Sequence, residues 1–482
     1  MISLRFVFFI IGALLVVLAA AMMVPALVDM ANEDRDSTVF LASAFTSAFF
    51  GGALLLTCRQ HSIEFTRHTG YLVTVGSWVF ITAFGSLPLI YSSLHIDVTD
   101  AVFETMSALT TTGSTVLSGL DTMPRGILLW RSIMQWIGGL GIVAMAILLL
   151  PFLRIGGMQL FLTESSAIGD KGTARFIQFA LAITAVYVAL TILCAAALVA
   201  VGMGVFDAVN HAMAALATGG FSTKDASVGY FNSVPIEVVL TVFMAAGALP
   251  LVFYVHLLRR GWCAFLMDSQ VPAFFIVLFG AILAVALWLW GRDGIAWWPA
   301  LRMSSFNVTS VLTDTGFGTA DFSRWGAFPV GVLFVLMLIG GCAGSTAGSI
   351  KIFRWQILWR GAHDHLQAML SPNKVRRVRF EDSPVSPEML ASVRNFFFLY
   401  LLTLGAISLA LMGTGMDFLA SFSAVAQAMA NAGPGLTHDI GPAGNFAHVP
   451  MAAKWLLILA MLLGRLELAT VYVLALRSFW TW

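Results

Sequence analysis

The sequence predicts an all-α polytopic membrane protein in which four related units surround a central pore. Each unit would hold a membrane helix, a short pore helix with a loop, and a second membrane helix. Of the 482 residues, 59% are hydrophobic and only 11% are charged, which leaves too little polar surface for a water-soluble globule. Apolar runs of about twenty residues, long enough to cross a hydrocarbon layer, recur along the chain. A glycine-containing motif recurs four times between them.

Ten apolar runs are expected to span the membrane. They cover residues 3–28, 38–57, 70–92, 127–153, 176–202, 235–258, 272–291, 327–350, 392–412 and 451–478. The first run has no small-residue cleavage site, so we interpret it as a retained helix. Residues 1–69 would therefore form two extra N-terminal transmembrane helices ahead of the repeats. The four pore units would occupy residues 70–153, 154–258, 259–360 and 392–482, with a cytoplasmic basic loop at 361–391.

The charges of the short loops predict the orientation of the chain. The segment between the first two runs is acidic, whereas the loops that follow the second, sixth and eighth runs are rich in Lys and Arg. Basic loops stay on the cytoplasmic side. We expect both termini to be cytoplasmic, in a multi-pass protein of the bacterial inner membrane. The net charge of +1 argues against a nucleic-acid partner.

The four motifs end in glycines at nearly even intervals. They are Ser107–Gly113, Ala214–Gly220, Ser310–Gly316 and Gln427–Gly433. The short helix before each motif begins near an acid or a proline, which suits a helix N-terminus. The C-terminal ends of these helices would then direct partial negative charge toward the point where the motifs converge. This arrangement favours a cation.

Glycine at these turns has a physical reason. Non-helical backbone at membrane depth is tolerated only where it is buried in protein or lines a wet cavity. Glycine permits the positive φ angles that turn successive carbonyls toward one axis, where a dehydrated cation can satisfy them. The alternative is that the loops merely join helices, but that interpretation does not explain why four such loops occur at matching places in four units. No catalytic constellation or metal-ligand spacing converges on the motifs, so we expect neither an enzyme nor a covalent or organic cofactor.

With these motifs the sequence resembles, over nearly its whole length, the superfamily of bacterial Trk and Ktr potassium uptake proteins and plant HKT transporters. The two extra N-terminal helices make it similar to the TrkH branch. The resemblance implies a simplified selectivity filter for K⁺, the transported ion, in which Gly113, Gly220, Gly316 and Gly433 are the filter glycines. It also implies that the ion path is lined by the backbone of Thr111, Thr112, Thr218, Gly219, Asp314, Thr315, Asn431 and Ala432. In the family, serine at the first glycine accompanies sodium selectivity, and Gly113 favours potassium here.

A second glycine-rich segment, residues 340–349, interrupts the eighth apolar run. Its four glycines weaken a helix by roughly 1 kcal/mol each, and its small residues Gly340, Gly344 and Gly348 could equally form a helix-packing face. The family has an intramembrane loop at this place, and the resemblance therefore favours a gate. The gate residues expected here are Gly340, Gly341, Gly344, Ser345, Thr346, Gly348 and Arg465.

Several charged or polar residues lie within the apolar runs or close to the motifs. Arg465 would face the pore as an electrostatic barrier, although a contact to backbone carbonyls is the alternative. Arg131 and Gln135, one turn apart, are expected behind the first pore loop. The carbonyl of Asp314 is a likelier ion ligand than its carboxylate, and Lys351 could either anchor the broken helix or face the inner vestibule.

The resemblance also implies partners. TrkH-like proteins work with a cytosolic nucleotide-binding, TrkA-like ring subunit, for which we expect docking on residues 154–175 and on the loop from Arg354 to Glu388. The chain itself has no nucleotide-binding motif. The family forms homodimers. Two mechanisms stay open: channel-like conduction gated by the partner, and a proton- or sodium-coupled potassium symporter, for which inverted repeats and buried acids would be expected.

Overall fold

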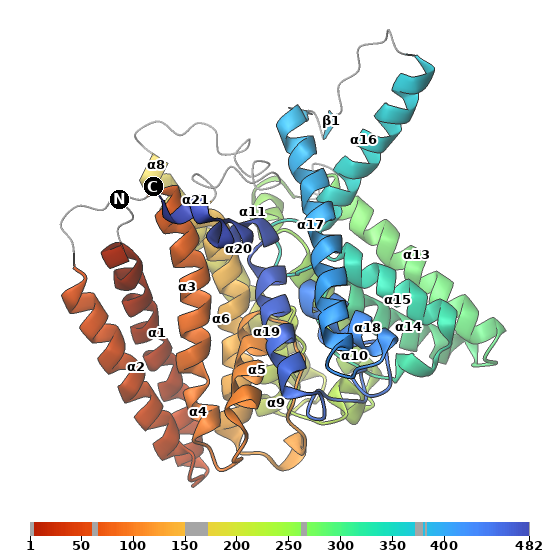
Figure 1. Cartoon of the computed structure of the whole chain (residues 1–482). Coiled ribbons are helices and arrows are strands. Elements are labelled where there is room, and N and C mark those ends of the chain that lie inside the picture. The colour runs from red at the N-terminus through yellow and green to blue at the C-terminus, as the bar shows by residue number, and fades with distance from the viewer. Residues whose placement is uncertain are drawn as a thin grey trace.

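Long helices that lie side by side form the framework of the protein (Figure 1). A computed structural model describes residues 4–59, 66–149, 172–261, 268–371, 379–380 and 383–481. Six helices in these ranges are long and apolar enough to cross a membrane, and each of two bent helix pairs adds one more if it counts as a single span. The predicted fold class is confirmed by this arrangement and by the comparisons given below.

The N-terminal hairpin consists of α1 (Leu4–Ala31) and α2 (Ser37–Thr57). These two helices pack on each other, and α1 also packs on α3 and α6 of the first unit. At the end of α1 the carboxylate of Asp29 accepts a hydrogen bond of 2.5 Å from the backbone N–H of Gly126. The hairpin is therefore fixed to the first unit at the same level as the start of α6.

In each of the four units a long helix is followed by a short pore helix and then by a second apolar helix. The first contains α3 (Arg67–Gly85), α4 (Leu87–Ile90), α5 (Val98–Leu109), a 3₁₀ turn (Leu120–Thr122) and α6 (Arg125–Leu149); the second contains α8 (Gly172–Ala200), α9 (Val205–Leu216), a 3₁₀ turn (Ser227–Phe231), α10 (Val234–Ala248) and α11 (Leu251–Arg260). The third contains α13 (Gln270–Gly291), α14 (Trp297–Leu312), a 3₁₀ turn (Phe322–Arg324), α15 (Ala327–Ile339) and α16 (Ile352–Leu370); the fourth contains α17 (Pro387–Met412), α18 (Phe418–Ala430), α19 (Met451–Arg465), α20 (Leu468–Ala475) and α21 (Arg477–Trp480).

The short pore helices are α5, α9, α14 and α18, and their starts follow the predicted signals. Asp97 caps α5, where its carboxylate accepts a hydrogen bond of 3.0 Å from the N–H of Thr99. This backbone hydrogen bond lowers the pKa of the Asp97 carboxyl. Asp207 lies in the first turn of α9, and Asp417 precedes α18. Acids at these ends complement the helix dipole.

Two predicted spans are bent. The run 235–258 divides into α10 and α11 at an angle of 96°, and the run 451–478 divides into α19 and α20 at 114°. At the first bend Pro250 has no N–H to donate, and the N–H of Leu251 donates to the carbonyl of Gly344 at 3.0 Å instead. At the second bend Glu467 adopts a positive φ of 64°. Both bends depend on contacts with distant segments, which sequence periodicity does not reveal.

Residues between the third and fourth units extend beyond the rest of the bundle. Helix α16 continues to Leu370, so part of the predicted basic loop is helical, and together with the start of α17 it projects from the body (Figure 1). Strands β1 (Arg379–Phe380) and β2 (Ser383–Pro384) pair antiparallel beside it. The basic residues Lys374, Arg376 and Arg377, and the segment 154–171, lie outside the described residues.

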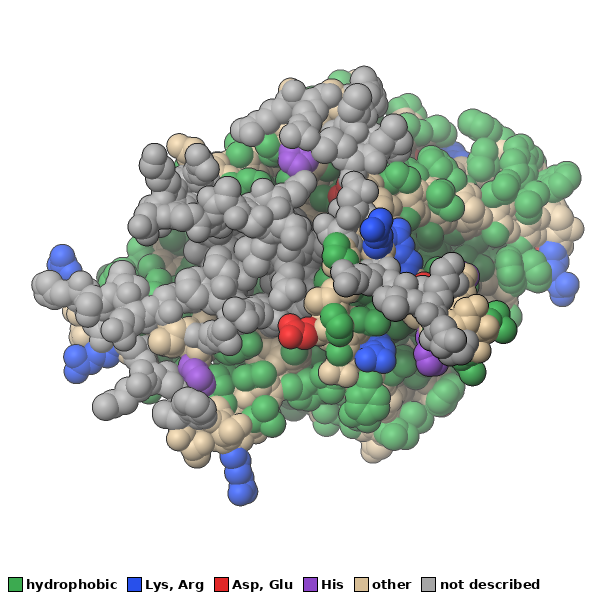
Figure 2. All heavy atoms as spheres, turned by 90° about the horizontal axis from the view of Figure 1, so that it is seen from above, with side chains coloured by type: hydrophobic (Ala, Val, Ile, Leu, Met, Phe, Trp, Pro, Cys, Tyr) green, Lys and Arg blue, Asp and Glu red, His purple; other side chains and the backbone are tan. Residues whose placement is uncertain are grey.

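Apolar side chains cover the flanks of the bundle. Phe45, Ile276 and Leu409 are each more than two-thirds exposed although they lie within long helices. Figure 2 views the protein from the side on which α1 begins and α21 ends, and hydrophobic side chains cover much of the right and lower parts of its outline. An apolar belt of this kind is expected where helices face lipid.

Candidate ion pore

The four pore helices end in the same backbone conformation. The residue two places before each motif glycine has a positive φ, of 54° at Thr111, 52° at Thr218, 57° at Asp314 and 58° at Asn431. The residue immediately before the glycine donates its N–H to the carbonyl five residues earlier: Thr112 to Ser107 at 2.8 Å, Gly219 to Ala214 at 2.9 Å, Thr315 to Ser310 at 2.9 Å and Ala432 to Gln427 at 3.0 Å. Left-handed residues and long back-bonds commonly end helices. None of the four left-handed residues is glycine, so the strained conformation is held four times by the surrounding protein.

The four motif glycines meet in a closed ring. Their φ angles are 83° at Gly113, 74° at Gly220, 88° at Gly316 and 89° at Gly433. A Cβ atom added to Gly113 would lie 2.0 Å from the carbonyl oxygen of Gly219, one on Gly220 1.9 Å from that of Thr315, one on Gly316 2.7 Å from that of Ala432, and one on Gly433 2.9 Å from that of Thr112. Each glycine thus faces the backbone carbonyl of the next unit, and the fourth faces the first. No side chain fits between the units at this level.

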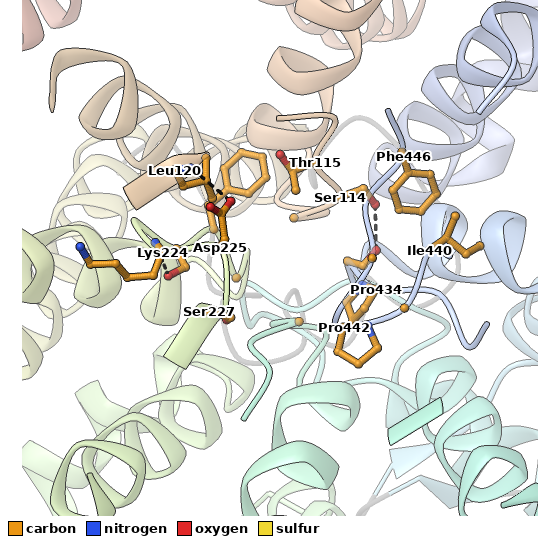
Figure 3. Close-up of a pocket in the computed structure, with 18 of the residues that line it drawn as sticks. Ser114, Thr115, Leu120, Lys224, Asp225, Ser227, Pro434, Ile440, Pro442 and Phe446 are labelled. Carbon is orange, nitrogen blue, oxygen red and sulfur yellow. Dashed lines mark hydrogen bonds between the residues drawn. The ribbon is translucent and has the colours of Figure 1, made fainter. Parts of the chain in front are cut away.

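A cavity of about 80 Å³ lies on one side of the glycine ring. The four glycines, Ser114 and Phe446 are among its lining residues (Figure 3). The hydroxyl oxygen of Ser114 lies 2.8 Å from the carbonyl oxygen of Gly433 and 2.9 Å from the side-chain oxygen of Gln427, so its one proton can be shared between them. These contacts join the first and fourth loops directly.

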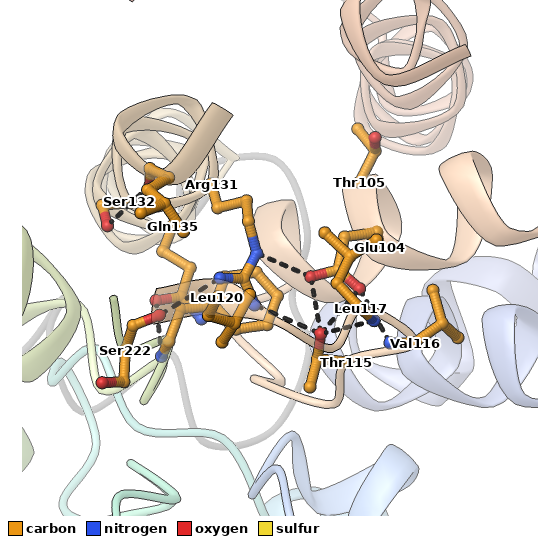
Figure 4. Close-up of polar contacts among 12 residues, drawn as sticks. Glu104, Thr105, Thr115, Val116, Leu117, Leu120, Arg131, Ser132, Gln135 and Ser222 are labelled. Atoms are coloured by element: carbon orange, nitrogen blue, oxygen red, sulfur yellow. Dashed lines mark hydrogen bonds and ion pairs between the residues drawn. The ribbon is translucent and has the colours of Figure 1, made fainter. Parts of the chain in front are cut away.

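An ion pair is buried behind the first two loops. Arg131 on α6 and Glu104 on α5 are 2.7 Å apart, and their side chains are 2% and 0% exposed. The Glu104 carboxylate also accepts from Thr115 and from the N–H of Val116, while Arg131 donates to the carbonyl of Ser222 (Figure 4). The pair therefore supports the loops that follow the motifs of two different units. Glu104 was not singled out in the sequence, although an acid within the apolar part of a pore helix, followed by Arg131 within the next span, could have indicated it.

Gln135 lies behind a different loop from the one predicted. Its amide nitrogen donates to the carbonyl of Gly219 at 2.6 Å, and its side-chain oxygen accepts from the N–H of Phe221 at 3.2 Å. Both partners belong to the second motif. The prediction that Gln135 binds the back of the first loop is wrong, because α6 leaves the first pore loop and passes alongside the second unit.

On the side of the glycine ring opposite the cavity, residues 340–351 form a buried, non-helical loop. Gly340, Gly344, Ser349 and Lys351 have positive φ angles. The loop bonds to the ends of two pore helices: the Thr346 hydroxyl donates to the carbonyl of Leu216 at 2.9 Å, and the N–H of Ser349 donates to that of Ala430 at 3.0 Å. The segment is therefore a loop that crosses beneath the motifs, and the alternative of a continuous small-residue helix face is wrong.

Two charged residues reach this loop from different units. Arg465, which is 4% exposed at the end of α19, donates from Nη1 to the carbonyl of Thr346 at 2.8 Å, while its Nε and Nη2 have no partner among the described residues. The Asp314 carboxylate accepts from the Ser349 hydroxyl at 2.8 Å. Its side chain therefore points to the loop, in keeping with the expectation that its carbonyl is the likelier ligand.

Glu467 pairs with a residue that the sequence did not suggest. Both carboxylate oxygens accept from Arg354 on α16 at 2.6 Å, and the Arg354 guanidinium lies 3.8 Å from the centre of the Phe396 ring. The pair joins the bend after α19 to the helix that follows the buried loop. Lys351 is the last residue of the same loop, directly before α16, and its side chain is half-buried.

Comparison with known proteins decides the family. The TrkH family model, described as a cation transport protein, matches residues 36–480. The chain belongs to the TrkH family. This membership agrees with the prediction that the chain is not an enzyme, and it confirms the resemblance drawn from the four motifs.

Relatives of this TrkH-family protein match along almost its full length. It is 41% identical to the Trk system potassium uptake protein TrkI of Halomonas elongata, over 98% of this chain and 96% of that protein. It is 35% identical to the Trk system potassium uptake protein TrkH of Escherichia coli K12, over 98% of each. The crystal structure of the potassium transporter TrkH from Vibrio parahaemolyticus superposes with a TM-score of 0.92 at 35% identity, covering 99% of both chains.

Proposed function

We propose that this protein takes up potassium across the bacterial inner membrane through a channel-like pore. The observation that carries the proposal is the closed ring of four glycines, each facing a backbone carbonyl of the next unit. Such a ring offers uncharged oxygens that can replace the water of a monovalent cation. The filter would consist of the motif glycines and the two residues before each of them. K⁺ is the transported ion, in keeping with the function named for the relatives.

The buried loop beneath the ring is the proposed gate. It consists of Gly340, Gly341, Gly344, Ser345, Thr346 and Gly348, with Arg465 bound to it. Its hydrogen bonds to the second and fourth pore helices hold it across the path beneath the ring. Opening requires these bonds to break, and the partly unpaired guanidinium of Arg465 would repel cations while the loop is closed.

Regulation is assigned to a cytosolic, nucleotide-binding, TrkA-like ring subunit, and the protein is proposed to be a homodimer. The α16–α17 projection supports a docking role, because it extends beyond the helices on the side where α1 begins (Figure 1). More basic than acidic side chains are visible on that face among the described residues (Figure 2). This charge distribution supports a cytoplasmic position for the face and for both termini.

Radioactive rubidium uptake into proteoliposomes tests the proposal. Uptake should follow the potassium electrochemical gradient and be inhibited by external K⁺. Gly220→Ala should abolish it, because the new Cβ would lie 1.9 Å from the Thr315 carbonyl oxygen. Gly280→Ala, where nothing lies within 4 Å, is the matched control and should transport normally. A wild-type protein that carries no rubidium, or a Gly220→Ala variant that carries it normally, would contradict the proposed pore.

The same vesicles distinguish conduction from symport. With no potassium driving force and an imposed proton gradient, a conducting pore gives no net rubidium accumulation. Accumulation under these conditions would establish proton coupling, and the same experiment with a sodium gradient tests sodium coupling. The four units turn the same motif toward one axis, which supports conduction over alternating access between inverted repeats.

A further inference from the structure

The side chain of Gln135 forms two hydrogen bonds to the backbone of the second motif. Its amide nitrogen donates to the Gly219 carbonyl at 2.6 Å, and its oxygen accepts from the Phe221 N–H at 3.2 Å. These two bonds lie on either side of Gly220 and fix which end of the amide faces which partner. Gln135 is fully buried, and it projects from α6 beside Arg131 (Figure 4). An amide held at both ends cannot turn away without leaving buried polar groups unpaired.

Gly219 differs from its counterparts in the other three motifs. The residue before the motif glycine is Thr112 in the first unit, Thr315 in the third and Ala432 in the fourth. A Cβ atom on Gly219 would lie 2.5 Å from Cδ of Gln135 and 2.7 Å from its nitrogen. Gly219 therefore lacks a side chain because Gln135 occupies the space that this side chain would take.

The first and third motifs are supported in another way. In these motifs two threonine hydroxyls bond to each other, Thr110 to Thr112 at 2.7 Å and Thr313 to Thr315 at 2.8 Å. The second motif has Ala217 and Gly219 at these places. Gln135 replaces the missing hydroxyl pair, but it bonds to the backbone carbonyl itself. Among the described residues, no side chain donates to the carbonyls of Thr112, Thr315 or Ala432.

This difference makes one of the four carbonyls unlike the others. A carbonyl that already accepts a strong hydrogen bond presents a weaker negative potential to an ion and is less free to tilt. Selectivity among monovalent cations depends on the number, field and freedom of the coordinating carbonyls. A smaller cation requires carbonyls that can move inward, so a fixed carbonyl disfavours it.

We propose that Gln135 is a specificity-determining residue of the pore, which positions the Gly219 carbonyl through its hydrogen bond and thereby favours K⁺ over the smaller Na⁺. The inference rests on the proposed function, because it assumes that the ring coordinates the transported ion. Gln135 acts through the Gly219 backbone and does not itself contact the ion.

The first test measures ion competition. Gln135→Met keeps the length of the side chain but removes both hydrogen bonds. In proteoliposomes, Na⁺ should then inhibit rubidium uptake about five- to tenfold more effectively relative to K⁺, which corresponds to the loss of one or two buried hydrogen bonds. Ser132→Ala is the matched control, since Ser132 is buried on the same helix and, within the described part of the chain, its side chain bonds only to the Leu128 carbonyl, at 3.3 Å. An unchanged Na⁺-to-K⁺ inhibition ratio in Gln135→Met would overturn the inference.

The second test uses rescue and does not depend on the activity of Gln135→Met. Gly219→Ala alone should abolish uptake, because its Cβ meets Gln135, whereas Gly219→Ala combined with Gln135→Ala should restore folding and measurable uptake. Size-exclusion elution and thermal unfolding of the purified variants report on folding. If Gly219→Ala is equally harmful in both backgrounds, Gln135 is not the reason for the glycine and the inference is wrong. Absence of uptake by the wild type would instead contradict the proposed function.

Discussion

Breaking the buried ion pair behind the loops should strongly destabilise the protein. Arg131→Met removes the partner of the Glu104 carboxylate, which is 0% exposed and cannot reach water. Removal of one partner of a buried pair costs about 3–5 kcal/mol, because a buried charge is left uncompensated. The variant also loses the bond to the Ser222 carbonyl at 3.2 Å and the stacking of the guanidinium 4.0 Å above the Phe221 ring. We therefore expect the upper end of this range.

The matching double variant separates charge from packing. In Arg131→Met combined with Glu104→Gln no buried charge remains, and the amide can still bond to Thr115. The expected loss is about 1–2 kcal/mol, which is about 3 kcal/mol less than the loss expected for Arg131→Met alone. The free energy of unfolding is measured by denaturant titration of all variants in mixed micelles.

A more exposed ion pair provides the control. Arg302 and Glu237 are also 2.7 Å apart, but the Arg302 side chain is 30% exposed. Glu237→Gln leaves an arginine that water can reach, and it should cost no more than about 1 kcal/mol. If the double variant is less than about 0.5 kcal/mol more stable than Arg131→Met, the reasoning from burial is refuted.

Three further predictions concern the buried loop and its anchors. Thr346→Val removes the one hydroxyl proton that is shared between the carbonyls of Leu216 and Gly247, at about 1 kcal/mol, so rubidium leak without a partner subunit should rise about fivefold; an unchanged leak would argue against a gate. Arg465→Ala should raise flux or relax its regulation in the same vesicles, and unchanged flux in a folded variant would count against a pore-facing charge. Glu467→Gln weakens the pair with Arg354, which is 4% exposed, and should lower the thermal unfolding temperature more than Asp364→Asn on the outer part of α16.

Local sequence determines much of the pore. Each motif contains its own helix end and glycine, and these features follow from short-range rules of helix termination that recur four times in the chain. Composition alone establishes the membrane environment, since a chain with 11% charged residues lacks the polar surface for water. The glycine-rich loop at 340–349 was likewise predictable, because four glycines within ten residues oppose a helix.

Tertiary structure decides which segments support which loop. Gln135 was expected behind the first motif and lies behind the second, and the bends at Pro250 and Glu467 are fixed by Gly344 and Arg354. These partners lie far apart in the chain. Periodicity and spacing describe the faces of single helices, whereas a buried polar group is satisfied by whichever neighbour the packing brings near. The sequence therefore determined the four turns, and only the assembled bundle decided how each of them is held.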